Sequence, residues 1–506
     1  MNRLAIDLQA ISGYVSFTIP VLFLGFLALG YFFSAWFHIG TAAFGLLLFI
    51  NVYFKHVQPK HTILRNFGIL GSARYLLESI GPELRQYFYS NDTEERPFNR
   101  TERAEVYRKA KNIDSAEAFG SLKEFDHHEI KLRHSMFPIL KKDLKPYSCT
   151  FGEERGIKNS YTIKRPFYIS AMSFGALGEH AIRSLARGAR MAGIPMNTGE
   201  GGYPKYHLME GPDIIFQMGT AKFGVRNDDS SLNDDKLRKL AAQQNIKMIE
   251  IKFSQGAKPG KGGLLPKEKI TKEISELRHV PLDKDVISPE RHIECDTPTN
   301  TVTFIKRVQD ISQLPVGIKM CIGCPEDVRT LVKEMKRQRV FPDYIQVDGS
   351  EGGTGASPKS FMDGVGLPLH AGLEAVHTVL TEERVRNKLK IVASAKLLNT
   401  RRQMVAFAHG ADAIAIARGF MFSLGCIQAL QCNKNTCPVG ITTHDKTLQH
   451  GLVIADKAER VANYAKNMHK EFNEILSAMG LHSVKDMTLS HMYEPSSNDS
   501  EVACKA

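Results

Sequence analysis

A long apolar stretch near the start of the chain, from about Gly13 to Phe54, contains no Asp, Glu, Lys or Arg. A membrane-crossing helix needs about 20 apolar residues, so this stretch is long enough for two crossings. It predicts a transmembrane helical hairpin with spans at Tyr14–Trp36 and His38–Phe54 and a turn between Ser34 and Gly40. Lys and Arg flank the outer ends of both spans, so both ends are expected on the cytoplasmic side. A helix pair buried in a soluble core is the alternative.

From Phe167 onward, short apolar runs alternate with amphipathic helical patterns, and strands that alternate with helices form parallel sheets. Several runs end in Gly, Ser, Lys or Arg, at the end where barrel enzymes carry their catalytic residues. We therefore predict an α/β protein with a (β/α)8 TIM barrel after the transmembrane hairpin. Its eighth strand is not identified by the pattern. The seven predicted strands are FYISAM (167–172), IPMNTG (194–199), KMIEIKFS (247–254), VGIKM (316–320), YIQVDG (344–349), KIVASA (390–395) and AIAIAR (413–418).

The same pattern predicts four parts of the chain. They are an N-terminal tail and hairpin (1–54), a connecting helical region (55–150), the barrel (151–450), and a C-terminal helix with a polar tail (451–506). The connecting region contains a turn and a helix within 91–112 and no recognisable catalytic motif. The last part contains a helix from about Ala455 to Met479, and its end, HMYEPSSNDSEVACKA, has the composition of a disordered segment.

The formal charge of +12 permits an anionic partner, but the basic residues are scattered and form no block typical of a nucleic-acid arm. Anionic substrates, phosphate and lipid headgroups are therefore favoured, and nucleic acid is not a predicted partner. Eight cysteines in 506 residues do not make a disulfide scaffold, which indicates reduced thiols in a cytosolic compartment.

Three cysteines, Cys426, Cys432 and Cys437, stand at a C-x5-C-x4-C spacing, and Pro438 follows the last. Thiolates on one short loop are the soft ligands that iron–sulfur clusters require. Zinc with His444 as a fourth ligand, or three unrelated buried thiols, are the alternatives. A second pair, in CIGC (321–324), is interpreted as packing rather than as a redox couple.

A glycine-rich loop, GGTGAS, follows the predicted strand 344–349 and offers backbone N–H groups to a phosphate or a flat cofactor. A tight turn without a ligand is the alternative. The last two predicted strands end where the phosphate site of a barrel usually forms, and an arginine there can grip phosphate with two hydrogen bonds. The residues at these three strand ends predicted to bind a cofactor are Gly352, Gly353, Thr354, Ser394, Arg418 and Gly419.

Five motifs together resemble the FMN-binding synthase domain of glutamate synthase: AMSFGALG (171–178), NTGEGG (197–202), KFSQGAKPGKGGLLP (252–266), GGTGASP (352–358) and GCIQALQCNKNTCPVG (425–440). The apolar hairpin ahead of HTILRNFGILGSARYLLESIGPELRQYF (61–88) makes the chain similar to the membrane-attached FMN-binding glutamate synthase family. The resemblance implies a (β/α)8 barrel, bound FMN and a [3Fe–4S] cluster on the three cysteines.

The resemblance also implies roles for residues at the strand ends. Met172, Ser173 and Gly175 are expected beside the flavin ring, and Lys252 on the side of its N1 and C2 carbonyl. Lys319 is expected to contact either the flavin or the substrate, although a structural ion pair is the alternative for both lysines.

Three further residues correspond to the family's anchors for 2-oxoglutarate. They are Glu200, Lys258 and Arg278, and two cations suit a dicarboxylate. Two departures bear on these roles. Leu264 stands where a substrate-contacting glutamine is expected, and ASAKLLNT (393–400) replaces the family's phosphate segment.

The predicted function is that of an FMN and iron–sulfur oxidoreductase that makes glutamate from 2-oxoglutarate and ammonia. No cysteine follows Met1 to act as a glutaminase nucleophile, and no G-x-G-x-x-G follows a strand to indicate a nicotinamide site. Ammonia and electrons are therefore expected from outside, the electrons from a ferredoxin or a reductase subunit. The predicted location is the inner (cytoplasmic) membrane. The first alternative is a membrane electron-transfer or redox-sensing subunit without this activity, the second is a zinc hydrolase, and the oligomeric state is left open.

Overall fold

The computed structural model describes residues 8–114, 116–121 and 130–493. The chain divides into two compact units after Arg100. The boundaries predicted at residues 54, 150 and 450 concern smaller parts of the chain and stay predictions.

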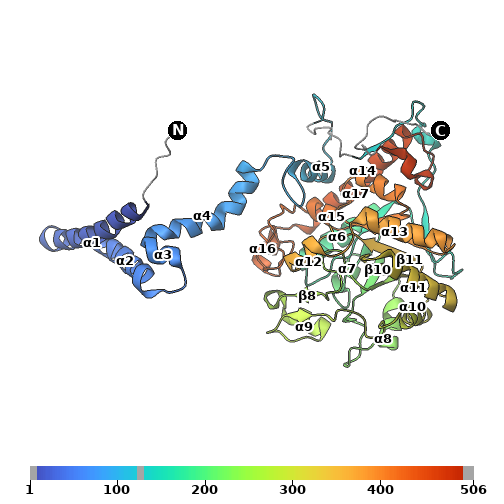
Figure 1. Ribbon diagram of the computed structural model, residues 1–506, viewed down its shortest axis with the longest axis horizontal. Helices are drawn as coiled ribbons and strands as arrows, with labels where there is room; N and C mark the ends of the chain where they lie inside the picture. Colours follow the sequence, from blue (N-terminus) through green and yellow to red (C-terminus); the bar gives the residue numbers. More distant parts are fainter. Residues whose placement is uncertain (1–7, 115, 122–129, 494–506) are drawn as a thin grey trace. The chain divides into compact units, whose positions relative to one another are not determined.

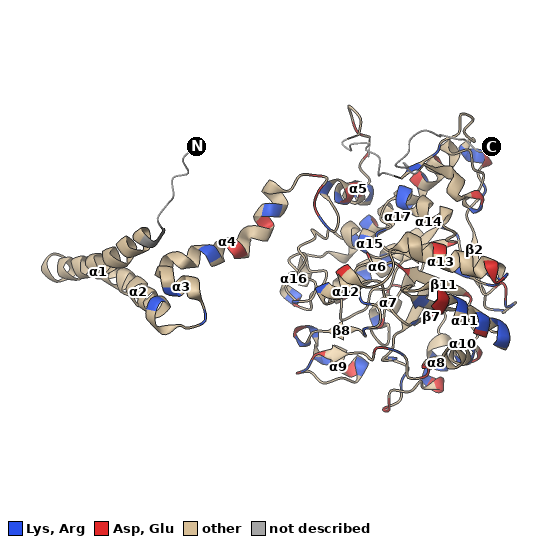
Figure 2. Ribbon diagram, viewed as in Figure 1, with Lys and Arg blue, Asp and Glu red and all other residues tan. Residues whose placement is uncertain are grey.

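The first unit begins with two apolar helices, α1 (Leu8–Phe32) and α2 (His38–Val52), joined by a turn that contains the 3-10 helix η1 (Ala35–Phe37) (Figure 1). The turn begins earlier than predicted because Ser34 leaves the helical conformation, with φ −160°. The described ribbon of α1 contains no charged residue (Figure 2). Two stretches of 23 residues, Ala10–Phe32 and Ala35–Val57, can cross a membrane by length and composition alone.

The side chains of this helix pair divide into a small polar contact and a large apolar surface. Asn51 and Lys55 donate hydrogen bonds of 3.3 and 2.9 Å to the Ser16 hydroxyl, which links α2 and the following turn to α1. Large apolar side chains such as Phe17 and Trp36 are exposed. The rest of the unit is helical, with η2 (Tyr53–Val57), α3 (Thr62–Phe67), η3 (Gly68–Leu70), α4 (Gly71–Leu84) and η4 (Arg85–Tyr89).

The second unit contains a closed barrel of eight parallel strands. In chain order the strands are β4 (Phe167–Ile169), β5 (Met196–Asn197), β6 (Ile214–Met218), β7 (Ile246–Lys252), β10 (Val316–Met320), β11 (Tyr344–Asp348), β12 (Lys390–Ser394) and β13 (Ala413–Ile416). The barrel closes where β13 pairs with β4. All seven predicted strands are present, and the closed barrel is confirmed.

The strand that the sequence pattern left unassigned is β6, IIFQM. All five of its residues are buried, so it shows no alternation of apolar and polar positions. A short apolar run of this kind cannot be distinguished from part of a buried helix by periodicity alone.

Helices follow the barrel strands and surround them (Figure 1). The apolar residues Ile182, Leu185 and Ala189 on α6 are fully buried, as an amphipathic helix on a sheet requires. The helices are α6 (Glu179–Ala192), α7 (Lys205–Met209), α8 (Asp234–Ala241), α10 (Pro298–Ser312), α11 (Pro325–Gln338), α13 (Leu369–Glu382), α14 (Thr400–Ala408) and α15 (Arg418–Ser423).

Three segments outside the strand–helix repeat position the site. The long connection from β7 to α10 carries β8 (Leu264–Leu265), η6 (Lys267–Lys269), α9 (Lys272–Arg278) and β9 (Val286–Ile287). The glycine-rich loop after β11 leads into α12 (Lys359–Gly364). The cysteine segment lies between α15 and α16 (Lys446–His450).

The ends of the second unit pack against the barrel helices. The helix α5 (Arg100–Ala110) and the long C-terminal helix α17 (Ile454–Ala478) confirm two predicted helices, and α17 packs on α6. The strands β2 (Cys149–Phe151) and β3 (Tyr161–Ile163) form a hairpin whose apolar side chains join the barrel core. The remaining short helices are η5 (Lys141–Asp143), η7 (Arg386–Lys388), η8 (Val484–Asp486) and η9 (Leu489–His491).

The prediction of a disordered polar end is wrong for its first residues. Strand β14 (Met492–Tyr493) pairs antiparallel with β1 (Lys131–Leu132), and the backbone hydrogen bonds of this pair order it. The remainder of that predicted tail, 494–506, lies outside the described residues.

Candidate active site

The predicted site residues stand at the carboxyl ends of the barrel strands. Because all eight strands are parallel and closed, these ends form one rim, and loops that are distant in sequence meet there. Lys252 on β7 and Lys319 on β10 are paired at the same register on neighbouring strands. The structure therefore brings the two predicted lysines side by side.

Each of these lysines faces a carboxylate. The Lys252 ammonium donates hydrogen bonds of 2.7 Å to both Glu200 Oε1 and Gln255 Oε1. The Lys319 ammonium lies 3.5 Å from Asp348 Oδ2, and both of those side chains are only 8% exposed. Both lysines therefore form ion pairs within the protein, as the alternative interpretation expected. Gln255 and Asp348 were not predicted, although both stand at or just after the end of a predicted strand.

The other two predicted substrate anchors contact main-chain carbonyls. Lys258 is 3% exposed, and its ammonium donates a 2.9 Å hydrogen bond to the Ala356 carbonyl in the glycine-rich loop. Arg278 donates to the Phe174 and Gly201 carbonyls at 2.7 and 3.2 Å. In this structure Arg278 therefore holds together the loops that follow β4 and β5.

The charges of this group act on one another. Burial raises the pKa of Glu200, but the nearby cations Lys252, Lys258 and Arg278 outweigh that effect and leave its pKa lowered. Burial, together with the charge of Lys252, lowers the pKa of Lys258 to about 8. Burial also lowers the pKa of Arg278 to about 10, so the guanidinium stays charged at neutral pH. Four cations thus share the rim with the carboxylates of Glu200 and Asp348, which suits an anionic ligand.

The glycine-rich loop after β11 has the features of an anion site. Within the described chain, the N–H groups of Gly353, Thr354 and Gly355 have no hydrogen-bond acceptor. Gly353 lies against Arg418, so closely that an added Cβ would come 2.9 Å from the guanidinium Nε. Arg418 also donates a 2.9 Å hydrogen bond to the Glu351 carbonyl. Consecutive free N–H groups beside the half-buried Arg418 guanidinium fit the phosphate of a cofactor such as FMN.

The other residues predicted near a cofactor have different surroundings. The Ser394 carbonyl accepts a 2.9 Å hydrogen bond from Gly349, which joins the ends of β11 and β12. Gly419 lies against the Tyr464 hydroxyl of α17, which leaves no room for a larger side chain, and its contact with a cofactor stays a prediction. Half-buried Lys396 lies close enough to Arg418 for that cation to lower its pKa further, although burial is the larger cause.

The loop after β4 holds the three residues predicted beside the flavin ring. The Met172 carbonyl accepts a 3.0 Å hydrogen bond from buried His207. Gly175 has φ +108°, a conformation that side-chain-bearing residues rarely adopt, and it contacts Arg278. Ser173 packs against Gly199 of the next loop, where a Cβ would lie 2.7 Å from its backbone nitrogen. The loop is therefore held rigidly at the rim.

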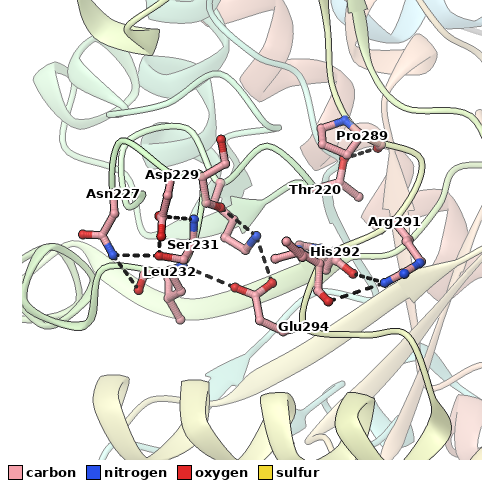
Figure 3. A network of polar contacts seen from close by, with 12 residues as sticks. Thr220, Asn227, Asp229, Ser231, Leu232, Pro289, Arg291, His292 and Glu294 are labelled. Atoms are coloured by element: carbon pink, nitrogen blue, oxygen red, sulfur yellow. Dashed lines mark hydrogen bonds and ion pairs between the residues drawn. The ribbon is translucent and has the colours of Figure 1, made fainter.

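Figure 3 shows a network of polar contacts that includes His292 and Glu294, and His292 also contacts the end of β7. His292, which is fully buried, forms a 3.0 Å hydrogen bond with the Lys252 carbonyl. Burial lowers the pKa of His292 to about 4, so its ring is neutral and donates this bond. Nearby, Glu294 pairs with buried Lys222 at 2.9 Å, and Thr220 donates to the Pro289 carbonyl at 2.6 Å. Nothing in the local sequence pattern marks these residues.

The three clustered cysteines carry free thiols. Burial raises the pKa of Cys426 to about 12, and the charges of Cys432 and Cys437 add to this, so the three sulfurs interact electrostatically. On α5, Tyr107 donates a hydrogen bond to the Cys426 carbonyl and Arg103 donates to the Ile427 carbonyl at 3.3 Å. The connecting region, in which the sequence showed no catalytic motif, therefore supports the cysteine segment.

The metal alternatives can be compared with this geometry. Among the described residues, no three His, Cys, Asp or Glu side chains are grouped as ligands of one metal ion. His444 instead bonds the Gly175 carbonyl at 2.9 Å and does not supply zinc with a fourth ligand. A three-iron cluster takes one thiolate on each iron, so three free thiols on one segment, one buried and two half-buried, fit its donor chemistry.

The pair in CIGC also has free thiols. Cys324 is exposed and is the N-cap residue that precedes α11, whereas the backbone N–H of half-buried Cys321 donates a 2.9 Å hydrogen bond to the Ser254 hydroxyl. The pair forms no disulfide, and it belongs to no metal-binding group in the described chain. The interpretation of this pair as packing stays a prediction.

Leu264 begins β8, which pairs with β9 beside the predicted substrate anchors. The preceding residue, Gly263, lies against the Glu200 carboxylate, and an added Cβ would clash with Oε1. Position 264 therefore directly follows a residue that lies against the Glu200 carboxylate. A leucine here offers no hydrogen bond to a ligand.

Comparison with known proteins identifies the family. The conserved region in glutamate synthase matches residues 99–482. A glutamate synthase large subunit-like protein of Bacillus subtilis is 38% identical over 496 residues, which cover 90% of this chain and 94% of that protein. The archaeal-type glutamate synthase (NADPH) of Thermotoga maritima is 36% identical over 325 residues, 64% of this chain and 61% of that protein. The chain thus spans about three fifths of the length of this second relative.

Solved structures also match this chain, at low sequence identity. A flavocytochrome b2 mutant with benzoylformate matches with a TM-score of 0.46 at 13% identity. The match covers 89% of this chain and 91% of that one. A lactate oxidase of Pediococcus acidilactici has a TM-score of 0.46 at 16% identity and covers 76% of this chain and 92% of its own. Similarity at this level bears on neither the cofactor nor the substrate. The family match over 99–482 and the relative that is 38% identical along nearly the whole chain show that this chain belongs to the glutamate synthase family of oxidoreductase enzymes.

Proposed function

We propose that this chain is an FMN and iron–sulfur oxidoreductase that forms glutamate from 2-oxoglutarate and ammonia, with electrons from an external donor. The main support for this proposal is that two groups suited to anionic ligands lie on the same rim of the barrel. A cation-rich group around Glu200 and Lys252 lies on the same rim as a glycine-rich loop with free N–H groups beside Arg418. When bound, FMN supplies hydride transfer and the cluster supplies one-electron transfer.

The chain's own residues divide into three groups in this proposal. Gly353, Thr354 and Arg418 hold the FMN phosphate through N–H groups and a guanidinium. Lys252, oriented by its ion pair with Glu200, supplies positive charge to the ring of the cofactor. Lys258 lies nearby and attracts the carboxylates of the substrate.

The three cysteines would hold a [3Fe–4S] cluster, which the resemblance implies and the free thiols fit. The external donor is a ferredoxin or a reductase subunit. Support comes from the family, in which relatives such as that of Thermotoga maritima are named NADPH-dependent, while this chain spans only part of their length.

One experiment tests the proposed function directly. Purified full-length protein is analysed for FMN, iron and acid-labile sulfide, and is then assayed anaerobically with reduced ferredoxin, ammonia and 2-oxoglutarate. Glutamate formation that is lost in Lys258→Ala supports the proposal. A protein without a flavin spectrum would reject it.

A second function is favoured by Leu264, which removes a hydrogen-bonding side chain from the neighbourhood of Glu200. In this alternative the protein is an electron-transfer or redox-sensing subunit that binds FMN and turns over no amino-acid substrate. The same assay separates the two, because the alternative predicts FMN and iron without glutamate formation.

The pH dependence of the proposed reaction should reflect Lys258. Its pKa is lowered to about 8, so the ammonium is charged below that pH and loses its proton as the pH rises through it. We therefore expect kcat/KM for 2-oxoglutarate to fall above about pH 8, since this ratio reports groups of the free enzyme. Lys258→Arg keeps its charge at higher pH and should move the fall upward. An unchanged alkaline fall in the arginine variant would assign it to another group.

We also propose that the hairpin of α1 and α2 anchors the protein in the inner (cytoplasmic) membrane, with the barrel in the cytoplasm. The exposed apolar side chains of both helices and the cations Lys55 and Arg65 after the second support this orientation. Leu24→Arg combined with Leu46→Arg should move the full-length protein out of the membrane fraction, because each arginine costs about 3 kcal/mol at mid-span. Leu489→Arg, an exposed leucine in the second unit, is the control and should leave fractionation unchanged.

A further inference from the structure

A buried lysine connects the cysteine segment to the loop after β4. Lys269 lies in η6, is 2% exposed, and is distant in sequence from both of its partners. Its ammonium donates one hydrogen bond to the Ala176 carbonyl and another, of 3.1 Å, to the Cys432 carbonyl. Ala176 directly follows Gly175 in the loop expected beside the flavin ring. One side chain thus contacts both of the elements expected to hold a redox group.

The charge of Lys269 is not balanced by a carboxylate. Among the described residues no Asp or Glu forms an ion pair with it, whereas buried Lys252 and Lys319 each have one. Both of its hydrogen-bond acceptors are uncharged main-chain carbonyls. A buried cation without a counter-charge is costly, so its surroundings call for an anion. Cys432, whose carbonyl accepts from Lys269, would contribute a thiolate to the proposed cluster.

We infer that Lys269 is a positioning residue that holds the cysteine segment against the loop after β4 and stabilises the added negative charge when the cysteine-bound centre takes up an electron. The inference rests on the proposed function and deepens it. A centre held by three thiolates is negatively charged and becomes more negative on reduction, so a fixed ammonium nearby favours the reduced state. Lys269 thereby makes the centre easier to reduce, while its two carbonyl contacts set the positions of both loops.

The test compares Lys269→Met with Lys267→Met, an exposed lysine in the same short helix. Full-length wild type and both variants are analysed for iron, sulfide and FMN, and the centre is titrated potentiometrically with detection by electron paramagnetic resonance. We expect Lys269→Met to shift the reduction equilibrium at least tenfold toward the oxidised state, about 59 mV for one electron. Lys267→Met should leave the potential unchanged.

Other results are equally decisive. If Lys269→Met keeps its iron and its potential equals that of wild type, the inference is wrong. If Lys269→Met loses its iron, the iron contents of Lys269→Arg and Lys269→Gln are compared to test the role of the charge. Iron retained only by the arginine variant supports the role of the charge, whereas iron kept or lost equally by both overturns it. Wild-type protein without iron and sulfide would instead reject the cluster in the proposed function, so the two failures are distinguishable.

Discussion

Replacement of Lys252 by methionine is expected to lower kcat by about 10²–10³-fold, the usual effect of removing one preorganised charge from a reacting centre. Lys252 ends β7, pairs with Glu200 at 2.7 Å, and its side chain is only 9% exposed. Without it, the Glu200 carboxylate loses its closest partner, and we expect a loss of about 3 kcal/mol in the free energy of unfolding. Steady-state kinetics and denaturant unfolding measure the two effects separately.

The control for this prediction lies on the same strand. Lys247, near the opposite end of β7, pairs loosely with Asp213 at 3.8 Å and is 33% exposed, so Lys247→Met should change stability by no more than about 1 kcal/mol. The double variant Lys252→Met with Glu200→Gln should recover most of the lost stability and none of the activity. Equal activity losses from Lys252→Met and Lys247→Met would contradict a specific role for Lys252.

The ion pair also predicts how stability depends on pH. The pKa of Glu200 is lowered in the folded protein, so its stabilisation is present above the ordinary carboxyl pKa and is lost as the pH falls through the lowered value. Lys252→Met removes the main cation that causes this, and should weaken the acid-side loss of stability.

The second large effect is expected from Cys437→Ser. Cys437 is the most buried of the three clustered cysteines, and serine is a poor ligand for iron. We expect iron and sulfide to fall to background while FMN is retained. Turnover with reduced ferredoxin should then fall below one per cent of wild type, about a 10²-fold loss, because electrons from the donor no longer reach the flavin.

Cys321→Ser and Cys324→Ser provide the matched controls, since both are free cysteines outside the clustered segment. Both variants should keep iron, sulfide and turnover within about twofold of wild type, as expected for side chains without a special interaction. Full iron content in Cys437→Ser would contradict the proposed cluster. Iron loss in the controls as well would show that the assay reports folding.

Local sequence patterns determined much of the architecture. Seven barrel strands followed from short apolar runs between helical patterns, and helices were expected where α5, α6 and α17 lie. The apolar hairpin was evident from the absence of charge in the first span. β6 was missed because a fully buried strand has no alternation, and the pairing of β14 with β1 depends on residues far apart in sequence.

The glycine-rich loop and the three cysteines were found because their chemistry requires several special residues close together in sequence. Partners supplied by distant segments were not. Asp348 completes the contacts of Lys319, and Lys269, which lies in the β7–α10 connection, contacts Cys432. Arg278 was predicted from its sequence position, but its carbonyl acceptors were not, because they lie in two other loops.

The sequence by itself thus determined the chemical groups available to this protein and the barrel that carries them, since both depend on local composition and spacing. The tertiary structure alone decided which groups meet. Closing the barrel places the carboxyl ends of all eight strands on one rim, where burial and neighbouring charges set the pKa of each group.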